Sequence, residues 1–132
     1  YRHVARSAGP DRVSLVTDAM AATGMTDGVY HLGPVAVDVV NGVARVAGTD
    51  TIAGSTATMD RVFKFAVTHS GLPGDEALML AVRQASINPA RALGLPCTGL
   101  VPGAAADLVV LDPDLAVTGV LCKGSWVIEL AH

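Results

Sequence analysis

Charged residues are scarce in this sequence, and those present do not form runs. Only 16% of the 132 residues are Asp, Glu, Lys or Arg, and the formal net charge at pH 7 is -3. The lack of basic runs argues against nucleic-acid binding, because such proteins neutralise phosphates with clustered Lys and Arg. Long apolar runs are also absent, and none approaches the roughly 20 residues of a membrane helix. We therefore expect neither nucleic acid nor a membrane as a partner.

Cysteine is rare as well. The two cysteines, Cys97 and Cys122, lie far apart and form no CxxC pair. Such usage argues against a disulfide framework and is typical of a reducing compartment. We predict two small core residues in a cytoplasmic protein.

Apolar residues are abundant by contrast. They make up 51% of the chain, and the mean hydropathy is +0.47. A chain of one-domain length has much surface to cover with polar groups, so this composition predicts that part of the surface is normally covered by something else. The first helical pattern has no start signal, so we also expect the chain to begin inside an element.

The residue pattern predicts helices first and strands last. A β-hairpin is expected at residues 35–40 and 43–46, because Asn41-Gly42 suits a two-residue type I′ turn. Residues 48–58 read as a loop leading into a helix. The other predicted elements are helices at residues 1–8, 59–70, 73–85 and 90–93, the last capped by Asn88-Pro89 and closed by Gly94, and strands at residues 108–111, 117–122 and 126–130.

One further strand is predicted at residues 13–17. Its sequence, Val-Ser-Leu-Val-Thr, is almost continuously apolar, which is typical of a parallel strand buried on both faces. A parallel strand needs neighbours, and no others are evident in this chain. We therefore expect an upstream segment to supply the rest of the sheet.

Two features are candidates for chemistry. Asp18 directly follows the predicted strand, where α/β barrels hold their catalytic groups, although an aspartate there is equally consistent with a turn or helix cap. The loop Gly48 to Ser55 is rich in small residues, whose exposed N–H groups suit a sugar or phosphate, although a simple connector has the same composition.

The histidines do not predict a metal site. No two of His3, His31, His69 and His132 have a spacing such as HxH or HxxxH. We expect His3 and His69 in helices and His31 before the hairpin, all in ordinary structural or surface roles. Neither a metal site nor a nucleophile wholly inside this chain is predicted.

Two motifs carry a resemblance to a known superfamily. They are Asn-Pro-Ala-Arg-Ala-Leu-Gly-Leu from Asn88, and Gly-Leu-Val-Pro-Gly-Ala-Ala-Ala-Asp-Leu-Val-Val-Leu-Asp from Gly99. Together they resemble the segments with which amidohydrolases leave their barrel and return to a small β-sandwich. The resemblance implies an α/β fold, with residues 1–94 as the C-terminal part of a (β/α)8 TIM-type barrel and residues 95–132 as strands of the small β-sandwich.

Two further stretches narrow the resemblance to the family of N-acetylglucosamine-6-phosphate deacetylases. They are Leu-Val-Thr-Asp-Ala from Leu15, and Thr-Ile-Ala-Gly-Ser-Thr-Ala-Thr-Met from Thr51, which is similar to the family's TLAGS-x-LTM. The resemblance implies that Asp18 is the catalytic aspartate. It also implies that Ile52, Ala53 and Gly54 contact the substrate.

The same resemblance implies a divalent metal, usually zinc in such sites, with its ligands outside this chain. Metal-bound water would attack the acetyl group, and Asp18 would pass a proton from that water to the departing amine. The implied partner is a small amino-sugar phosphate, and the full-length enzyme is expected to be a homo-oligomer, a dimer.

Two alternatives remain open from the sequence. Another amidohydrolase, such as a cyclic-amide hydrolase, would share the Asn88 and Gly99 motifs but not the stretch from Thr51. A non-catalytic assembly protein on the same scaffold would have no need of a carboxylate at Asp18.

The expected distribution of ligands gives a first test. We predict that the isolated, refolded 132-residue chain retains no catalytic metal, because the implied ligands lie elsewhere in the full-length protein. Elemental analysis after gel filtration measures this directly. Stoichiometric zinc in the refolded chain would contradict the prediction.

Overall fold

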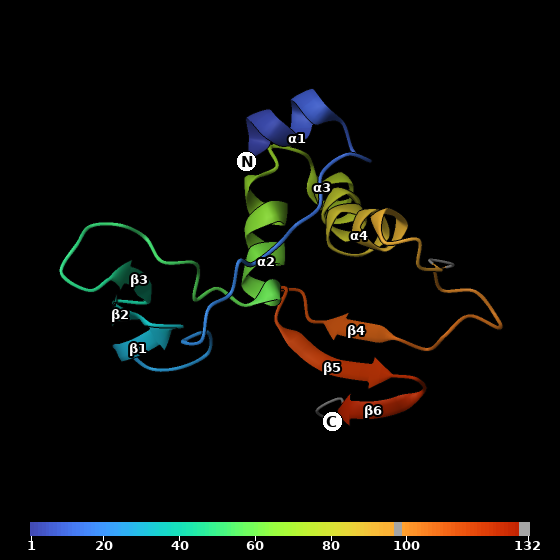
Figure 1. Ribbon diagram of the computed structural model, residues 1–132. Helices are drawn as coiled ribbons and strands as arrows, with labels where there is room; N and C mark the ends of the chain where they lie inside the picture. The colour runs from blue at the N-terminus through green and yellow to red at the C-terminus, as the bar shows by residue number, and fades with distance from the viewer. Residues whose placement is uncertain (97–98, 130–132) are drawn as a thin grey trace.

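A computed structural model describes residues 1–96 and 99–129 of the chain (Figure 1). Helices and two small sheets make up the fold, which bears out an α/β composition. Both sheets have three strands and are antiparallel. None of the helices in these two ranges is long and apolar enough to cross a membrane.

The first sheet contains the predicted hairpin. Strands β2 (Val35–Val40) and β3 (Val43–Val46) pair antiparallel, and the prediction of their turn is confirmed. Asn41 and Gly42 have φ angles of 52° and 70°, the left-handed values that a type I′ turn requires. The carboxylate of Asp27 accepts the N–H groups of both turn residues.

A third strand, β1 (Gly28–Leu32), was not predicted. It pairs with β2 across a two-residue turn in which Leu32 lies opposite Val35 and Gly33 has a φ of 59°. His31 precedes the hairpin as predicted and lies within this additional strand. The Gly-Pro pair at the turn was the available signal.

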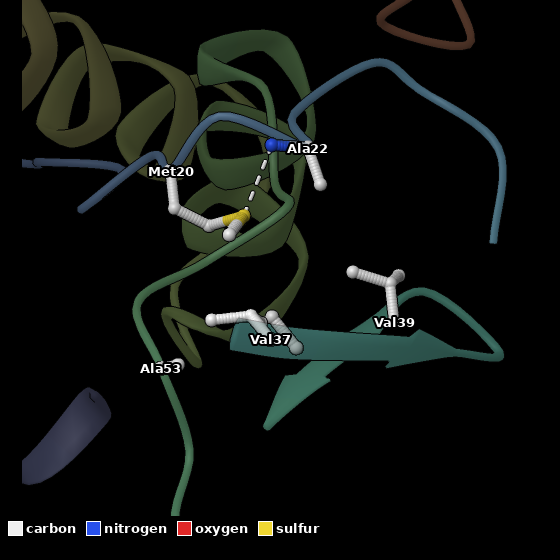
Figure 2. Close-up of a cluster of buried hydrophobic side chains, with 6 residues drawn as sticks. Met20, Ala22, Val37, Val39 and Ala53 are labelled. Carbon is white, nitrogen blue, oxygen red and sulfur yellow. Dashed lines mark hydrogen bonds between the residues drawn. The ribbon is translucent and has the colours of Figure 1, made fainter. Parts of the chain in front are cut away.

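One face of this sheet carries a buried apolar cluster. Val37 and Val39 project from β2 toward Met20 and Ala22, which lie on the segment ahead of β1 (Figure 2). Ala44 of β3 and Ala53 of the following loop complete the cluster. The small alanines allow both segments to lie close to the sheet, so the core attaches the residues around positions 20 and 53 to one scaffold.

Helix α1 (Arg2–Ala8) and helix α2 (Met59–His69) form as predicted, with Gly71 at a φ of 75° after α2. The next two predicted helices are in fact one continuous helical stretch. It comprises α3 (Gly74–Val82), a π-helical segment η1 (Arg83–Ile87) and α4 (Asn88–Ala92). Gly94, with a φ of 66°, closes it as expected.

The prediction that Asn88-Pro89 begins a separate helix is wrong. Asn88 has helical φ and ψ angles of -66° and -47°, and its N–H donates to the carbonyl of Arg83, five residues back. A proline inside a helix clashes with the carbonyl four residues earlier, and a π turn relieves that clash without ending the helix.

The second sheet consists of β4 (Leu108–Leu111), β5 (Val117–Cys122) and β6 (Ser125–Ile128), in that order. The first two match their predictions, whereas β6 ends at Ile128 and Leu130 lies outside the described residues. Cys122 is exposed, so the prediction that it is a core residue is wrong. Cys97 lies outside the described residues.

The strand predicted at residues 13–17 stays a prediction, because the neighbours expected for it lie outside this chain. The segment is extended but has no strand assignment, and Val16 is 74% exposed. A strand is defined by a neighbouring strand, and both sheets of the described residues lie elsewhere in the chain. Residues 13–17 therefore have no strand partner among the described residues.

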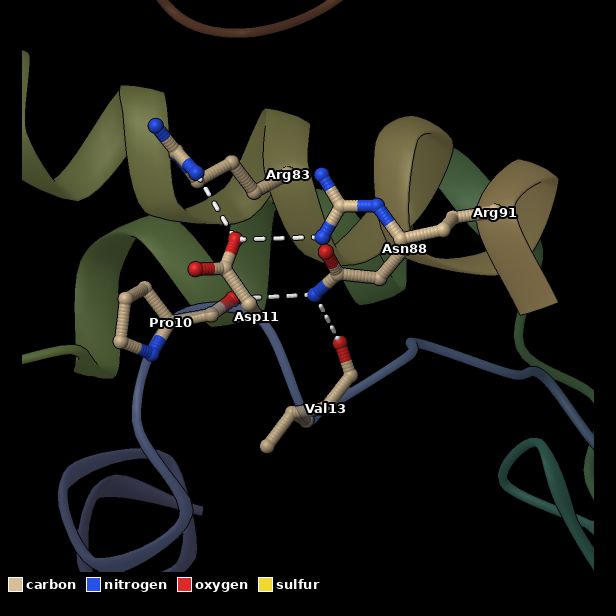
Figure 3. A network of polar contacts seen from close by, with 6 residues as sticks. All are labelled: Pro10, Asp11, Val13, Arg83, Asn88 and Arg91. Atoms are coloured by element: carbon tan, nitrogen blue, oxygen red, sulfur yellow. Dashed lines mark hydrogen bonds and ion pairs between the residues drawn. The ribbon is translucent and has the colours of Figure 1, made fainter. Parts of the chain in front are cut away.

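Polar contacts from the helical stretch hold this segment in place (Figure 3). The side-chain amide of Asn88, which is buried, donates to the carbonyls of Pro10 at 2.9 Å and Val13 at 2.6 Å. The N–H of Leu15 donates to the carbonyl of Gln84 at 2.8 Å. On the surface, Asp11 pairs with Arg83 at 2.8 Å.

The buried amide should matter more than the surface ion pair. We predict that Asn88→Ala lowers the free energy of unfolding of the full-length protein by about 2 kcal/mol, because two carbonyls lose their partner. The matched control Arg83→Ala should cost less than about 1 kcal/mol, since both members of its ion pair are about half exposed. Urea unfolding of both variants measures the difference, and equal losses would contradict the prediction.

Candidate active site around Asp18

The structure brings Asp18 and the loop around Gly54 together, although they lie far apart in the sequence. The N–H of Ser55 donates to the carbonyl of Asp18 at 2.8 Å, and the N–H of Met20 donates to the carbonyl of Ser55 at 2.9 Å. These bonds form an isolated parallel bridge between Ala19 and Ser55. Two candidates that the sequence offered separately therefore form one site.

Asp18 itself has an unusual backbone. Its φ is 52°, in the left-handed region that few residues other than glycine adopt. The residue is exposed, so its side chain is accessible from solvent. In the turn that follows, the hydroxyl oxygen of Thr17 accepts the N–H of Ala19 at 3.3 Å. The turn therefore has a side-chain cap that does not involve Asp18, which weakens the interpretation of this aspartate as a cap.

Gly54 is required at its position for two reasons. Its φ is 70°, and a Cβ atom placed on it would lie 3.1 Å from the carbonyl oxygen of Asp18 and 3.2 Å from the Cβ of Met20. Both distances are shorter than ordinary contacts. The loop can approach the backbone of Asp18 this closely only because residue 54 has no side chain.

The two residues before Gly54 differ in what they can offer. Ile52 is 67% exposed and pairs with Arg45 in an isolated antiparallel bridge. Ala53 is 6% exposed, and its N–H donates to the carbonyl of Ala44 at 3.0 Å. The side chain of Ile52 is therefore available to a ligand, whereas Ala53 has its methyl group in the core.

Further polar contacts hold the end of the loop. The hydroxyl of Thr23 donates to the carbonyl of Ser55, and the hydroxyl oxygen of Ser55 accepts the N–H of Ala57. A hydrogen bond from Thr58 lowers the pKa of the Asp60 carboxyl below its ordinary value of 3.8. Asp60 therefore carries its negative charge in the first turn of α2, where the helix dipole favours it.

The remaining polar candidates lie away from this site. His3 and His69 are in helices as predicted, and His132 lies outside the described residues. The part of the chain that the structure describes contains no group of three His, Cys, Asp or Glu side chains that could hold a metal ion. These residues thus do not by themselves fit the metal that the resemblance implies.

Two residues of the site were not identified from the sequence. Ser55 lies in a loop of small residues, and Met20 lies in a short apolar stretch. Neither has a local signal, because their roles come from a contact between distant segments.

A surface pocket of about 370 Å³ was likewise unpredicted. It lies over β2 and β3, apart from Asp18, and its lining consists of Asp38, Val40, Val43, Arg45, Gly48, Thr49 and Asp50.

Comparison with known proteins gives consistent matches. The N-acetylglucosamine-6-phosphate deacetylase of Rattus norvegicus is 39% identical over 94% of this chain and 30% of its own length. The N-acetylgalactosamine-6-phosphate deacetylase of Escherichia coli O157:H7 is 38% identical over 86% of this chain and 29% of its own. The chain thus spans about 30% of the length of these two relatives.

A solved structure matches more closely. It is an aspartate-to-alanine mutant of N-acetyl-D-glucosamine-6-phosphate deacetylase from Mycobacterium smegmatis, in complex with N-acetyl-D-glucosamine-6-phosphate. The sequence identity is 70% and the TM-score 0.95, over 98% of this chain and 34% of that one.

The model of the amidohydrolase family matches residues 12–127, which include Asp18, the loop around Gly54, strands β1 to β5 and all of β6 except its last residue. The chain belongs to the amidohydrolase family.

Proposed function

We propose that the full-length protein is a metal-dependent N-acetylglucosamine-6-phosphate deacetylase, which yields glucosamine 6-phosphate and acetate. The observation that carries the proposal is the hydrogen bond from the N–H of Ser55, the residue after Gly54, to the carbonyl of Asp18, which holds the loop against this aspartate. A candidate proton carrier and a candidate substrate-binding segment thus lie at one site. Relatives with this activity in their names match nearly the whole chain.

The chemistry assigned to Asp18 is proton transfer. Its carboxylate accepts a proton from the water that attacks the acetyl carbonyl, and then donates that proton to the nitrogen of the leaving amine. An amine leaves poorly unless it is protonated, so one carboxylate serves both steps. The exposure of Asp18 gives water and substrate access to it.

The metal is proposed to bind through ligands elsewhere in the full-length protein. It is divalent, with zinc as the candidate from the family resemblance, and it would activate the attacking water. Asp18 alone supplies too few ligands for it, and the other acidic and histidine residues that the structure describes do not gather into a metal-binding group.

The loop is proposed to contact the sugar phosphate. Ile52 offers an exposed apolar side chain, and Gly54 lets the loop lie close enough to Asp18 for a substrate to contact both. Ala53 contributes only its backbone, since its methyl group is buried.

The domain organisation is part of the proposal. Residues 1–94 would form the C-terminal part of a (β/α)8 barrel, and residues 95–132 would contribute strands to a small β-sandwich. Large exposed apolar side chains in both parts support it, among them Val16 at 74% and Val127 at 68%. A dimer of the full-length protein stays a prediction of the family resemblance, and a cytoplasmic location stays a prediction from the cysteine usage.

A second candidate substrate is N-acetylgalactosamine 6-phosphate. The Escherichia coli relative that carries this name is nearly as similar to the chain as the rat enzyme. The two substrates differ only in the configuration of one hydroxyl. Comparing kcat/KM for both sugars distinguishes them, and a preference for the galactose form would change the assigned substrate without changing the assigned chemistry.

The role of Asp18 can be tested by removing its basicity. We predict that Asp18→Asn in the full-length enzyme lowers kcat by about 10² to 10⁴-fold, because proton transfer belongs to the chemical steps. Metal content and melting temperature should change little, since the amide keeps the size of the side chain. Near-normal kcat with a lowered melting temperature would instead show that Asp18 only stabilises its turn.

The role of the loop can be tested with two matched glycines. Gly54 and Gly48 have almost the same φ, 70° and 72°, but a Cβ at Gly48 would meet no atom within 4 Å. We predict that Gly54→Ala impairs turnover by about tenfold or more, because the loop must move away from Asp18. Gly48→Ala carries a similar backbone strain without the clash and should leave kcat/KM within about twofold. Equal effects of the two substitutions would mean that the loop is only a connector.

A further inference from the structure

Met20 links Asp18 to the core of the first sheet. The side chain of Met20 is 7% exposed and belongs to the cluster formed with Ala22, Val37, Val39, Ala44 and Ala53. Its sulfur accepts the N–H of Ala22 at 3.0 Å, as Figure 2 shows. Met20 is two residues from Asp18, and its side chain is fixed both by packing and by this bond.

Met20 also limits where the loop can lie. Its Cβ and Cγ would be 3.2 Å and 3.6 Å from a Cβ on Gly54, so its side chain lies directly against this glycine. Its N–H is bonded to Ser55 at the same time. The loop therefore packs at Gly54 against both the backbone of Asp18 and the side chain of Met20.

From these contacts we infer that Met20 is a positioning residue, which fixes the carboxylate of Asp18 relative to the loop from Ile52 to Gly54. This inference rests on the proposed role of Asp18. The left-handed backbone of Asp18 persists only if its surroundings determine it, and Met20 is the buried side chain that joins Asp18 to the sheet. A displacement of about 1 Å in a catalytic group can cost about a hundredfold in rate.

The test compares Met20 with Val39, a member of the same cluster that lies on β2 and is 3% exposed. Both Met20→Ala and Val39→Ala remove buried volume and should lower the melting temperature of the full-length, metal-loaded enzyme. Met20→Ala should also lower kcat for N-acetylglucosamine 6-phosphate by about tenfold or more. Val39→Ala should leave kcat within about twofold, measured well below both melting temperatures.

A second background separates positioning from general destabilisation. If Met20 acts through Asp18, then Met20→Ala should change kcat less than about twofold in the Asp18→Asn enzyme, because there is no proton carrier left to misplace. The same fractional loss in both backgrounds, or equal losses for Met20→Ala and Val39→Ala, would overturn the inference.

A conservative variant keeps the test decisive if Met20→Ala does not fold. Met20→Leu retains buried volume but branches at Cγ, beside Gly54, and cannot accept the N–H of Ala22. It should lose about threefold in kcat, less than the alanine variant, and nothing further in the Asp18→Asn background. If Met20→Leu leaves kcat unchanged in an enzyme whose turnover still requires Asp18, the positioning role of Met20 is overturned and the proposed function is not. A normal kcat for Asp18→Asn itself overturns the proposed function, and the positioning role with it.

Discussion

The pair of backbone hydrogen bonds between Ser55 and the residues Asp18 and Met20 is the contact on which the candidate site depends. A residue other than glycine held at a φ of 52° costs roughly 1 to 3 kcal/mol, with aspartate among the residues that tolerate it best. Each backbone hydrogen bond contributes about 0.5 to 1.5 kcal/mol net. The two bonds together are thus of the size needed to offset the strain, so the conformation of Asp18 is a property of the loop as much as of Asp18.

The first sheet gives this contact its rigidity. Its hairpin is specified locally by Asn41-Gly42 and by the carboxylate of Asp27, so the sheet can form without help from distant residues. Met20, from the segment of Asp18, and Ala53, from the loop, both pack into the apolar cluster on this sheet. The segment of Asp18 and the loop are therefore both attached to the same sheet. This attachment allows a site made of exposed residues to keep a fixed geometry.

Local signals in the sequence predicted the parts of the fold that local chemistry determines. The turn at Asn41-Gly42, the end of α2 near Gly71 and strands β4 and β5 all follow from turn residues and periodicity. Asn88-Pro89 misled for the same reason, since a strong capping pair was overridden by the π turn and by the contacts of the Asn88 amide with distant carbonyls. The strand at residues 13–17 stays a prediction, because its pairing depends on neighbours that we expect outside this chain.

The candidate site, like the fold, was predictable from the sequence only in part. Asp18 was identifiable as the residue after an apolar segment, and its chemical role followed only from the family resemblance. The loop was identifiable from its small residues, but its contact with Asp18 was not, because nothing in either segment records the distance between them. Met20 is the extreme case, since a methionine in an apolar stretch has no distinguishing pattern at all.

The π turn at Arg83–Ile87 also changes what the helix can bind. In a regular helix the carbonyl of Gln84 would accept the N–H of Asn88, but that N–H goes to Arg83, and Pro89, the next residue, has none to give. The carbonyl of Gln84 is thereby released from the helix and accepts the N–H of Leu15 instead. Because the nitrogen of Pro89 carries no hydrogen, the carbonyl of Gln84 is available to hold the segment that ends at Asp18. Pro89 thus affects the candidate site indirectly, because it leaves the carbonyl of Gln84 free to accept the N–H of Leu15.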